Sequence, residues 1–156
     1  EVLARADAHR GTSLVEIYQN CNVFNDGAFE VFTEKANKPT NTLFVEQGKP
    51  LTFANGTKGI CIKEMKPRII DIGPDFSPND CWIHDERDNF KASILVRLFE
   101  DPRHEGAFPR PFGVFYVADR PTHEDKLQGH VKRAKEVKGV GDLDALLKGE
   151  HTWTIA

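Results

Sequence analysis

The sequence has no excess of basic residues and no long apolar run. Its 21 Lys and Arg residues stand against 24 Asp and Glu residues, which gives a net charge of -3, so we expect no nucleic-acid partner. The longest apolar stretches, such as residues 112–118, are too short to cross a bilayer, and the first residues lack the basic-then-apolar pattern of a signal peptide. We therefore expect a cytoplasmic protein that has no membrane partner.

Closely spaced cysteine pairs are also absent. The three cysteines, Cys21, Cys61 and Cys81, are widely separated and form no CxxC motif. This pattern is typical of a reducing compartment and argues against a disulfide scaffold. The remaining composition, 39% hydrophobic and 29% charged residues in a chain of 156, is that of a soluble globular protein with its own core.

The first part of the chain has the pattern of an α/β unit. A periodic segment over residues 1–10 predicts a helix that Gly11 ends, and Ser13–Tyr18 has the β-branched and aromatic content of a buried strand. A polar loop, residues 19–27, follows before a short helix over residues 28–35. In open α/β sheets ligands bind beyond the carboxyl ends of strands, so this loop is the first candidate for a functional site.

The middle of the chain changes to short strand-like runs. Between residues 42 and 72, four such runs are separated by Gly, Pro and Asn turns and predict a small β meander. After a polar loop, Asp85 or Asp88 is the expected cap of a helix. Its predicted core stripe comprises Phe90, Ala92, Ile94, Val96, Leu98 and Phe99.

The last part predicts one strand and two helices. Residues 112–117 form an apolar run typical of a buried strand, and Thr122 is the expected cap of a helix that Gly139-Val-Gly141 ends. Asp142 then begins a short helix that extends to Lys148.

Several blocks in this sequence carry a family resemblance. The run from His9 to Gly27 contains a predicted strand followed by a loop in which a cysteine closely precedes Phe-Asn. This run is similar to the end of the thiamine-diphosphate-binding fold in β subunits of 2-oxoacid:ferredoxin oxidoreductases. Further blocks resemble the carboxy-terminal half of that subunit in the same order: Gly48–Phe53, Lys58–Ile60, His84-Asp85, Arg120–Thr122 and Thr152–Thr154.

The resemblance implies an α/β fold with two parts. Residues 1–26 would be a remnant of the thiamine-diphosphate-binding parallel sheet, and residues 27–156 a small mixed α+β carboxy-terminal domain. The fragment would then present an unpaired strand edge at Ser13–Tyr18.

The resemblance also implies a site around Cys21. Many family members hold a [4Fe–4S] cluster whose fourth cysteine occupies the matching loop, so Cys21 is the candidate metal ligand, although Asn20 stands where the family often has proline. Asn20, Asn22 and Asn25 are the candidate cofactor-binding residues. The other cluster cysteines and the Gly-Asp-Gly motif that binds Mg²⁺ and the diphosphate are expected upstream of residue 1, because we interpret Gly139-Val-Gly-Asp142 as a helix end and a helix cap.

The implied activity is the oxidative decarboxylation of a 2-oxoacid to an acyl-CoA, with electrons passed to ferredoxin. The full enzyme would use thiamine diphosphate, Mg²⁺ and the cluster, and its partners would be an α subunit, ferredoxin, the 2-oxoacid and coenzyme A. We assign no catalytic residue to this chain and expect the fragment alone to be inactive, with no cofactor bound.

Four alternatives remain open. Cys21 is also compatible with an ordinary loop cysteine, and the whole chain is also compatible with a non-catalytic α/β protein-interaction domain. Cys81 and His84 have the spacing of half a zinc site but lack a second ligand pair. His9, His84, His123 and Glu16 carry the imidazole and carboxylate groups that acid–base catalysis uses, yet no nucleophile or orienting partner can be assigned to them.

One helix has a basic polar side. This basic side could attract an acidic ferredoxin, but it is explained more simply as a helix surface exposed to solvent. Its basic residues are Lys126, Lys132, Arg133, Lys135 and Lys138.

Overall fold

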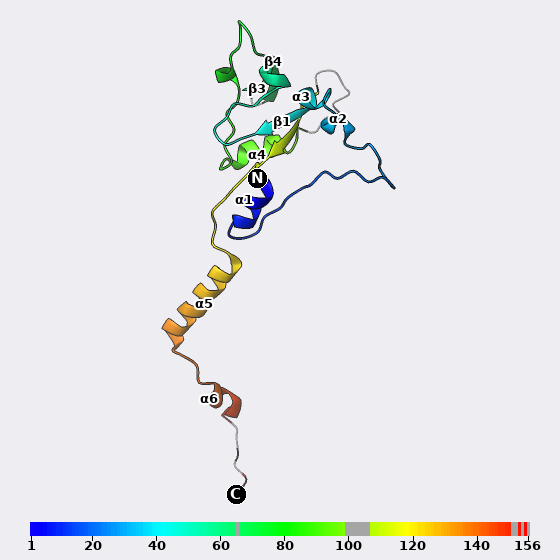
Figure 1. The fold of residues 1–156 in the computed structure, drawn as a ribbon. Helices are drawn as coiled ribbons and strands as arrows, with labels where there is room; N and C mark the ends of the chain where they lie inside the picture. The colour runs from blue at the N-terminus through cyan, green and yellow to red at the C-terminus, as the bar shows by residue number, and fades with distance from the viewer. Residues whose placement is uncertain (65, 99–106, 151–152, 154, 156) are drawn as a thin grey trace. The chain divides into compact units, whose positions relative to one another are not determined.

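The computed structural model describes residues 1–64, 66–98, 107–150, 153 and 155, which form two compact units (Figure 1). The first unit contains Glu1–Ala6 and Leu14–Ala118, and the second contains Asp7–Ser13 and Asp119–Ala156. The fold is mixed α/β and contains both a parallel and an antiparallel sheet. The expected fold class is therefore confirmed at the level of a small mixed domain.

Two small sheets organise the first unit. β1 (Thr42–Val45) pairs in parallel with β5 (Arg110–Gly113), with Thr42 opposite Arg110. β2 (Thr52–Phe53), β3 (Lys58–Lys63) and β4 (Lys66–Asp71) form an antiparallel sheet in that order. The predicted meander is confirmed for β2 to β4, whereas β1 belongs to the other sheet.

The segment from Cys81 to His84 joins these strands without forming a long strand itself. The N–H of Leu51 donates to the carbonyl of Trp82, and the N–H of Trp82 donates to the carbonyl of Ile60, at 2.9 and 2.7 Å. The N–H of Ile60 in turn donates to the carbonyl of Leu51 at 2.9 Å. Three chain segments therefore form hydrogen bonds with one another's backbone N–H and carbonyl groups in the interior.

Gly59 allows this close approach. A Cβ atom at Gly59 would lie 2.2 Å from the Sγ atom of Cys81, which is closer than any real contact. Cys81 is buried and packs where Gly59 leaves room. Only glycine fits this position of β3 without displacing the thiol.

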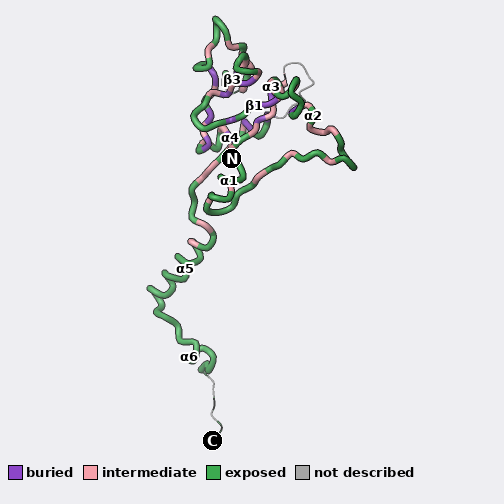
Figure 2. The backbone as a smooth tube through the Cα atoms, viewed as in Figure 1, coloured by how far each residue is buried: buried purple, intermediate pink, exposed green. Residues whose placement is uncertain are grey.

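The core lies between the sheets and α4 (Asn89–Leu95), as the buried segments in Figure 2 show. Asp88 caps α4 by accepting hydrogen bonds from the N–H groups of Phe90 and Lys91. Full burial of one aliphatic side chain contributes about 1.5–3 kcal/mol, so this cluster is the main source of stability in the unit. Its buried members are Leu43, Val45, Leu51, Phe53, Ile60, Leu95 and Leu98.

The predicted stripe on α4 is only partly correct. Ala92 and Leu98 are buried, but Phe90 and Val96 are exposed, and Leu95, which the stripe omitted, is almost completely buried. Because the helix spans only two turns, a small error in its phase changes which side chains face the core. Phe99 lies outside the described residues.

The predicted buried strand at Ser13–Tyr18 is wrong. These residues form no strand, and the side chains of Leu14 and Ile17 are 97% and 67% exposed. A strand requires a neighbour for its backbone groups, and none of the described strands pairs with this segment. Glu16, expected in the strand interior, is exposed as well.

Other boundaries also differ from prediction. The first helix is confirmed as α1 (Val2–Ala8), while the helix expected over residues 28–35 is reduced to α2 (Glu30–Thr33). A further short helix, α3 (Lys38–Asn41), has proline in its first turn, where the missing N–H does no harm. The strand predicted over residues 112–117 is shifted to β5 and ends at Gly113. Two 3-10 turns, η1 (Ala54–Gly56) and η2 (Pro78–Asp80), complete the unit.

The second unit contains the two carboxy-terminal helices. α5 (His123–Lys138) begins at a capping box in which Thr122 and Asp125 exchange side-chain and backbone hydrogen bonds, as predicted for Thr122. Arg10 forms an ion pair with Asp125 in the same unit. α6 (Leu143–Lys148) begins at Asp142, which confirms the interpretation of Gly139-Val-Gly-Asp142 as a helix end and a cap.

Candidate functional site

The loop around Cys21 is a defined turn at the surface of the first unit. Cys21 and Asn25 form an isolated antiparallel bridge, in which the N–H of Asn25 donates to the carbonyl of Cys21 at 3.0 Å. The three residues between them make the turn. The thiol at its start is half-buried.

Asn20 holds the rest of the loop together. Its side-chain amide donates to Oδ1 of Asn22 at 2.9 Å and to Oδ1 of Asp26 at 2.8 Å. Its own Oδ1 accepts from the N–H of Gly27 at 2.9 Å. A single side chain therefore joins both ends of the turn, which is typical of Asn in loops.

The structure thus brings together the residues predicted around Cys21. Asn20 and Asn22 are in direct contact through their side chains, and Asn25 takes part through its backbone. Their proposed contact with a cofactor stays a prediction.

The electrostatics of the loop favour the thiolate form of Cys21. Hydrogen bonds from the backbone N–H of Phe24 above all, together with those of Val23 and Asn25, lower the pKa of the Cys21 thiol, against a smaller opposing effect of burial. Backbone donors act here as fixed partial positive charges beside the sulfur. A thiolate is the form that binds metals and attacks electrophiles.

Aromatic side chains anchor the loop on the sheet. The ring of Tyr18 stacks on Phe29 with a centroid distance of 4.6 Å, and these two residues lie on either side of the Cys21 turn. Tyr18 also meets Phe112 of β5 edge-to-face at 5.5 Å. Such pairs are worth about 0.5–1.5 kcal/mol each beyond the area they bury.

This role of Tyr18 is not predicted from the sequence. The signal available was the pair of aromatic residues, Tyr18 and Phe29, that bracket the polar loop, but nothing local to the loop reveals Phe112 as their partner.

The tip of the loop exposes apolar side chains. Val23 and Phe24 are 81% and 91% exposed, and they lie two and three residues after Cys21. Exposed apolar groups that lie together mark interaction surfaces more often than single ones do.

Cys81 and His84 belong to the interior. Burial raises the pKa of the Cys81 thiol, so this sulfur stays protonated and unreactive. His84 is 1% exposed, and its Nε2 lies 2.8 Å from the carbonyl oxygen of Val114, whereas no described group pairs with its Nδ1. Within the described ranges no three His, Cys, Asp or Glu residues are placed to hold one metal ion.

Glu86, two residues after His84, is a buried carboxylate. Both of its oxygens accept hydrogen bonds from the guanidinium group of Arg5 in α1. This contact lowers the pKa of the Glu86 carboxyl. The ion pair ties α1 to the segment that precedes α4.

The remaining candidates for acid–base chemistry are not gathered into a site. Glu16 is exposed in the segment before the Cys21 loop. His123 is the first residue of α5, as expected for a residue in the first turn, and His9 lies just after α1.

The described residues thus define a mixed α/β domain that presents the Cys21 thiol, with its pKa lowered by backbone N–H groups, in an anchored surface loop. The chain is 30% identical, over 159 aligned residues, to the 2-oxoglutarate oxidoreductase subunit KorB of Mycobacterium tuberculosis. The alignment covers 99% of this chain and 41% of that protein, so the chain spans about two fifths of the length of this curated relative. The chain is thus similar, along almost its whole length, to a part of a 2-oxoacid oxidoreductase subunit.

The other comparisons give no match. No family model matches the chain, and no solved structure does so either. In the described part of the chain, every helix is too short or too polar to cross a bilayer.

Proposed function

We propose that this chain is the carboxy-terminal part of the β subunit of a thiamine-dependent 2-oxoacid:ferredoxin oxidoreductase. The collinear similarity to KorB supports this proposal along the whole chain. The observation that carries it is the anchored Cys21 loop, because its backbone donors favour a thiolate at the position where the family resemblance expects a cluster ligand.

In this proposal Cys21 provides one thiolate ligand of a [4Fe–4S] cluster. The donor set fits such a role, since thiolates are the ligands of iron–sulfur clusters and N–H groups directed at the sulfur tune their potentials. The described residues supply this single ligand, and the other three come from the remainder of the β subunit. The exposed Val23 and Phe24 would then pack against that remainder.

The three asparagines give the loop its shape and polarity. Asn20 fixes the turn through its contacts with Asn22, Asp26 and Gly27, and we assign Asn20, Asn22 and Asn25 to the side of the loop that faces the thiamine cofactor. In the whole enzyme Mg²⁺ and the diphosphate bind to residues upstream of this segment. Residues 1–26 then end the cofactor-binding domain, and residues 27–156 form the carboxy-terminal domain.

The reaction of the whole enzyme would be the oxidative decarboxylation of a 2-oxoacid to an acyl-CoA in the cytoplasm. Thiamine diphosphate would supply carbanion chemistry and the cluster one-electron chemistry, while the protein would contribute position and environment. The α subunit, ferredoxin, the 2-oxoacid and coenzyme A are the partners, and the isolated 156-residue chain is inactive.

An activity assay on the complete enzyme tests this proposal. The β subunit that contains this segment is co-expressed with its α subunit without oxygen, and 2-oxoacids are screened for coenzyme-A-dependent reduction of ferredoxin. We expect one of them to be oxidised, with activity lost in the Cys21→Ser variant and kept in the Cys61→Ser variant. Absence of any 2-oxoacid-dependent reduction, or full activity of Cys21→Ser, contradicts the proposal.

A second function, a non-catalytic interaction domain, is favoured by the exposed apolar side chains of α5 and α6. None of the described side chains of these two helices is buried. Stable, stoichiometric binding of a protein other than an oxidoreductase subunit, with no iron in the complex, would favour this function. The apolar residues concerned are Leu127, Val131, Val137, Leu143, Leu146 and Leu147.

A further inference from the structure

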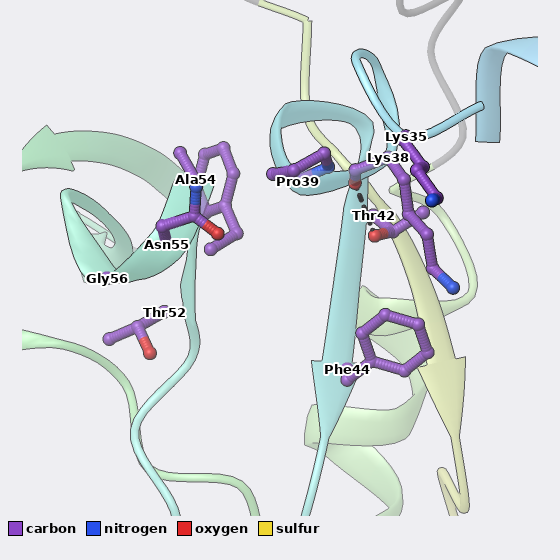
Figure 3. Close-up of a pocket in the computed structure, with 10 residues that line it drawn as sticks. Lys35, Lys38, Pro39, Thr42, Phe44, Thr52, Ala54, Asn55 and Gly56 are labelled. Carbon is purple, nitrogen blue, oxygen red and sulfur yellow. Dashed lines mark hydrogen bonds between the residues drawn. The ribbon is translucent and has the colours of Figure 1, made fainter. Parts of the chain in front are cut away.

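A pocket of about 420 Å³ lies in the first unit, apart from the Cys21 loop. Figure 3 shows α3 and β1 on one side of it and β2 with η1 on the other. Pockets that hold small molecules are typically about 300–1,000 Å³ in volume, so this one is large enough for a compact ligand.

One wall of the pocket carries two positive charges. Lys35 precedes α3, Lys38 begins it, and Figure 3 shows both side chains on the side of β1 near Phe44. The ten lining residues include no carboxylate, and neither lysine forms an ion pair within the described part of the chain. The pocket therefore attracts anions.

The rest of the lining is largely apolar. Pro39, Phe44, Phe53 and Ala54 contribute apolar surface, and the ring of Phe44 is more than half exposed. The ammonium group of Lys38 lies 5.5 Å from the centroid of that ring. A flat ligand ring placed here would meet both an aromatic side chain and a cation.

A rigid turn forms the opposite wall. Ala54 and Asn55 both have positive φ, 51° and 56°, a conformation that residues other than glycine rarely adopt. The N–H and hydroxyl groups of Thr57 both donate to the carbonyl of Ala54 and hold this turn closed. Asn55 belongs to the lining at this turn (Figure 3), and its side-chain amide offers a hydrogen-bonding group for a polar ligand atom.

We propose that this pocket binds a small planar aromatic or heteroaromatic molecule that carries an anionic group such as a phosphate. The ring lies against Phe44 and Pro39, and the anion is held by Lys35 and Lys38. The proposal is independent of the function of the Cys21 loop, because the two places share no residue.

A titration with phenyl phosphate, followed in ¹H–¹⁵N correlation spectra of the 156-residue chain, tests this site. We expect saturable shifts at Thr42, Thr52, Asn55 and Gly56, and a loss of affinity of at least about tenfold in Lys35→Gln/Lys38→Gln, because two charged contacts to the anion disappear. The matched control Lys63→Gln/Lys66→Gln removes two exposed lysines from the β3–β4 hairpin and leaves the affinity unchanged.

Two simpler probes separate the parts of the ligand. Inorganic phosphate lacks the ring and benzyl alcohol lacks the anion, so we expect each to bind at least about tenfold more weakly than phenyl phosphate. The proposal is overturned if inorganic phosphate binds as tightly, if the lysine-pocket variant keeps its affinity while its spectrum shows an intact fold, or if the shifts are spread over the lysines of α5.

Discussion

The cluster around Leu43 and the segment around Cys21 belong to the same compact unit, yet different forces hold them in place. Leu43 is 0% exposed and is surrounded by side chains from both sheets and α4, whereas Leu14 and Phe24, on either side of the thiol, are almost entirely exposed. The first region is fixed by apolar burial. The second is fixed by the hydrogen bonds of Asn20 and by the stacking of Tyr18 on Phe29.

The core around Leu43 therefore determines the stability of the unit, and the Cys21 loop carries the proposed functional residues. The core segment folds around its own apolar residues, while the Cys21 loop is a surface turn with a thiol of lowered pKa and an apolar tip. Binding residues are often found on such loops held by a rigid scaffold. Variants in the two regions should therefore change different measurements.

Truncation in the core should give the largest effect. We expect Leu43→Ala to lower the free energy of unfolding by about 2–5 kcal/mol, since it leaves a cavity among fully buried side chains. Leu14→Ala makes the same chemical change at an exposed site and should stay within about 0.5 kcal/mol of the parent chain. Urea denaturation of both variants measures the contrast, and equal losses would show that residues 14–24 are packed as firmly as the core.

Crowding at β3 should have the next largest effect. We expect Gly59→Ala to cost about 1–3 kcal/mol, because the added methyl group meets the Cys81 thiol. Combining it with Cys81→Ala removes the clash, so the double variant should lose less than the sum of the two single variants. Strict additivity in the same denaturation experiment would mean that the two residues do not touch.

The ion pair between Arg5 of α1 and Glu86 should contribute less to the free energy of unfolding. It should contribute only at pH values above the acidic range. Arg5 lowers the pKa of Glu86, so the unfolded chain binds this proton more readily than the folded chain does. The pair therefore stabilises the fold at pH values above the pKa that Glu86 has in the unfolded chain. This stabilisation disappears as the pH falls through the lower pKa that Glu86 has in the folded chain.

We expect Arg5→Met to cost about 1 kcal/mol at pH 7, a modest value because Arg5 is 42% exposed, and almost nothing at the acidic end. Unfolding curves of both proteins between pH 3 and pH 7 measure this difference. A constant difference across that range would show that the lowered pKa of Glu86 has no part in it.

Loss of the aromatic anchor should have the smallest effect on stability and a clear effect on the thiol. We expect Tyr18→Ala to shift the pH profile of Cys21 alkylation to higher pH, because a loosened turn no longer directs the N–H groups of Phe24 and Val23 at the sulfur. Tyr18→Phe keeps the ring and should keep the profile. Peptide mapping by mass spectrometry follows Cys21 separately from Cys61 and Cys81, and an unchanged profile in Tyr18→Ala would exclude a positioning role for Tyr18.

Local signals in the sequence predicted local structure well. The caps at Thr122 and Asp142 are predictable, and Asp88 is one of two candidates, because a capping residue and the N–H groups it satisfies lie within one turn. The β3–β4 hairpin was found for the same reason, since its strands follow one another directly.

Non-local structure was harder to predict. The parallel pairing of β1 with β5 joins residues 42–45 to residues 110–113, and no nearby residue indicates that contact. Ser13–Tyr18 has the composition of a buried strand, but composition does not supply the neighbouring strand. The position of Cys21 came from the family resemblance, whereas its N–H environment and the anchor at Tyr18 required the structure.

The most direct test of the proposed cluster ligand is the iron and acid-labile sulfide content of the complete β subunit, purified without oxygen in complex with its α subunit. Our account predicts about four iron and four sulfide per β subunit, the content of one [4Fe–4S] cluster, in the parent protein and in Cys61→Ser. Cys21→Ser, a substitution in an exposed loop, should fold and lose this cluster. A Cys21→Ser subunit with the iron and sulfide content of the parent would contradict the account.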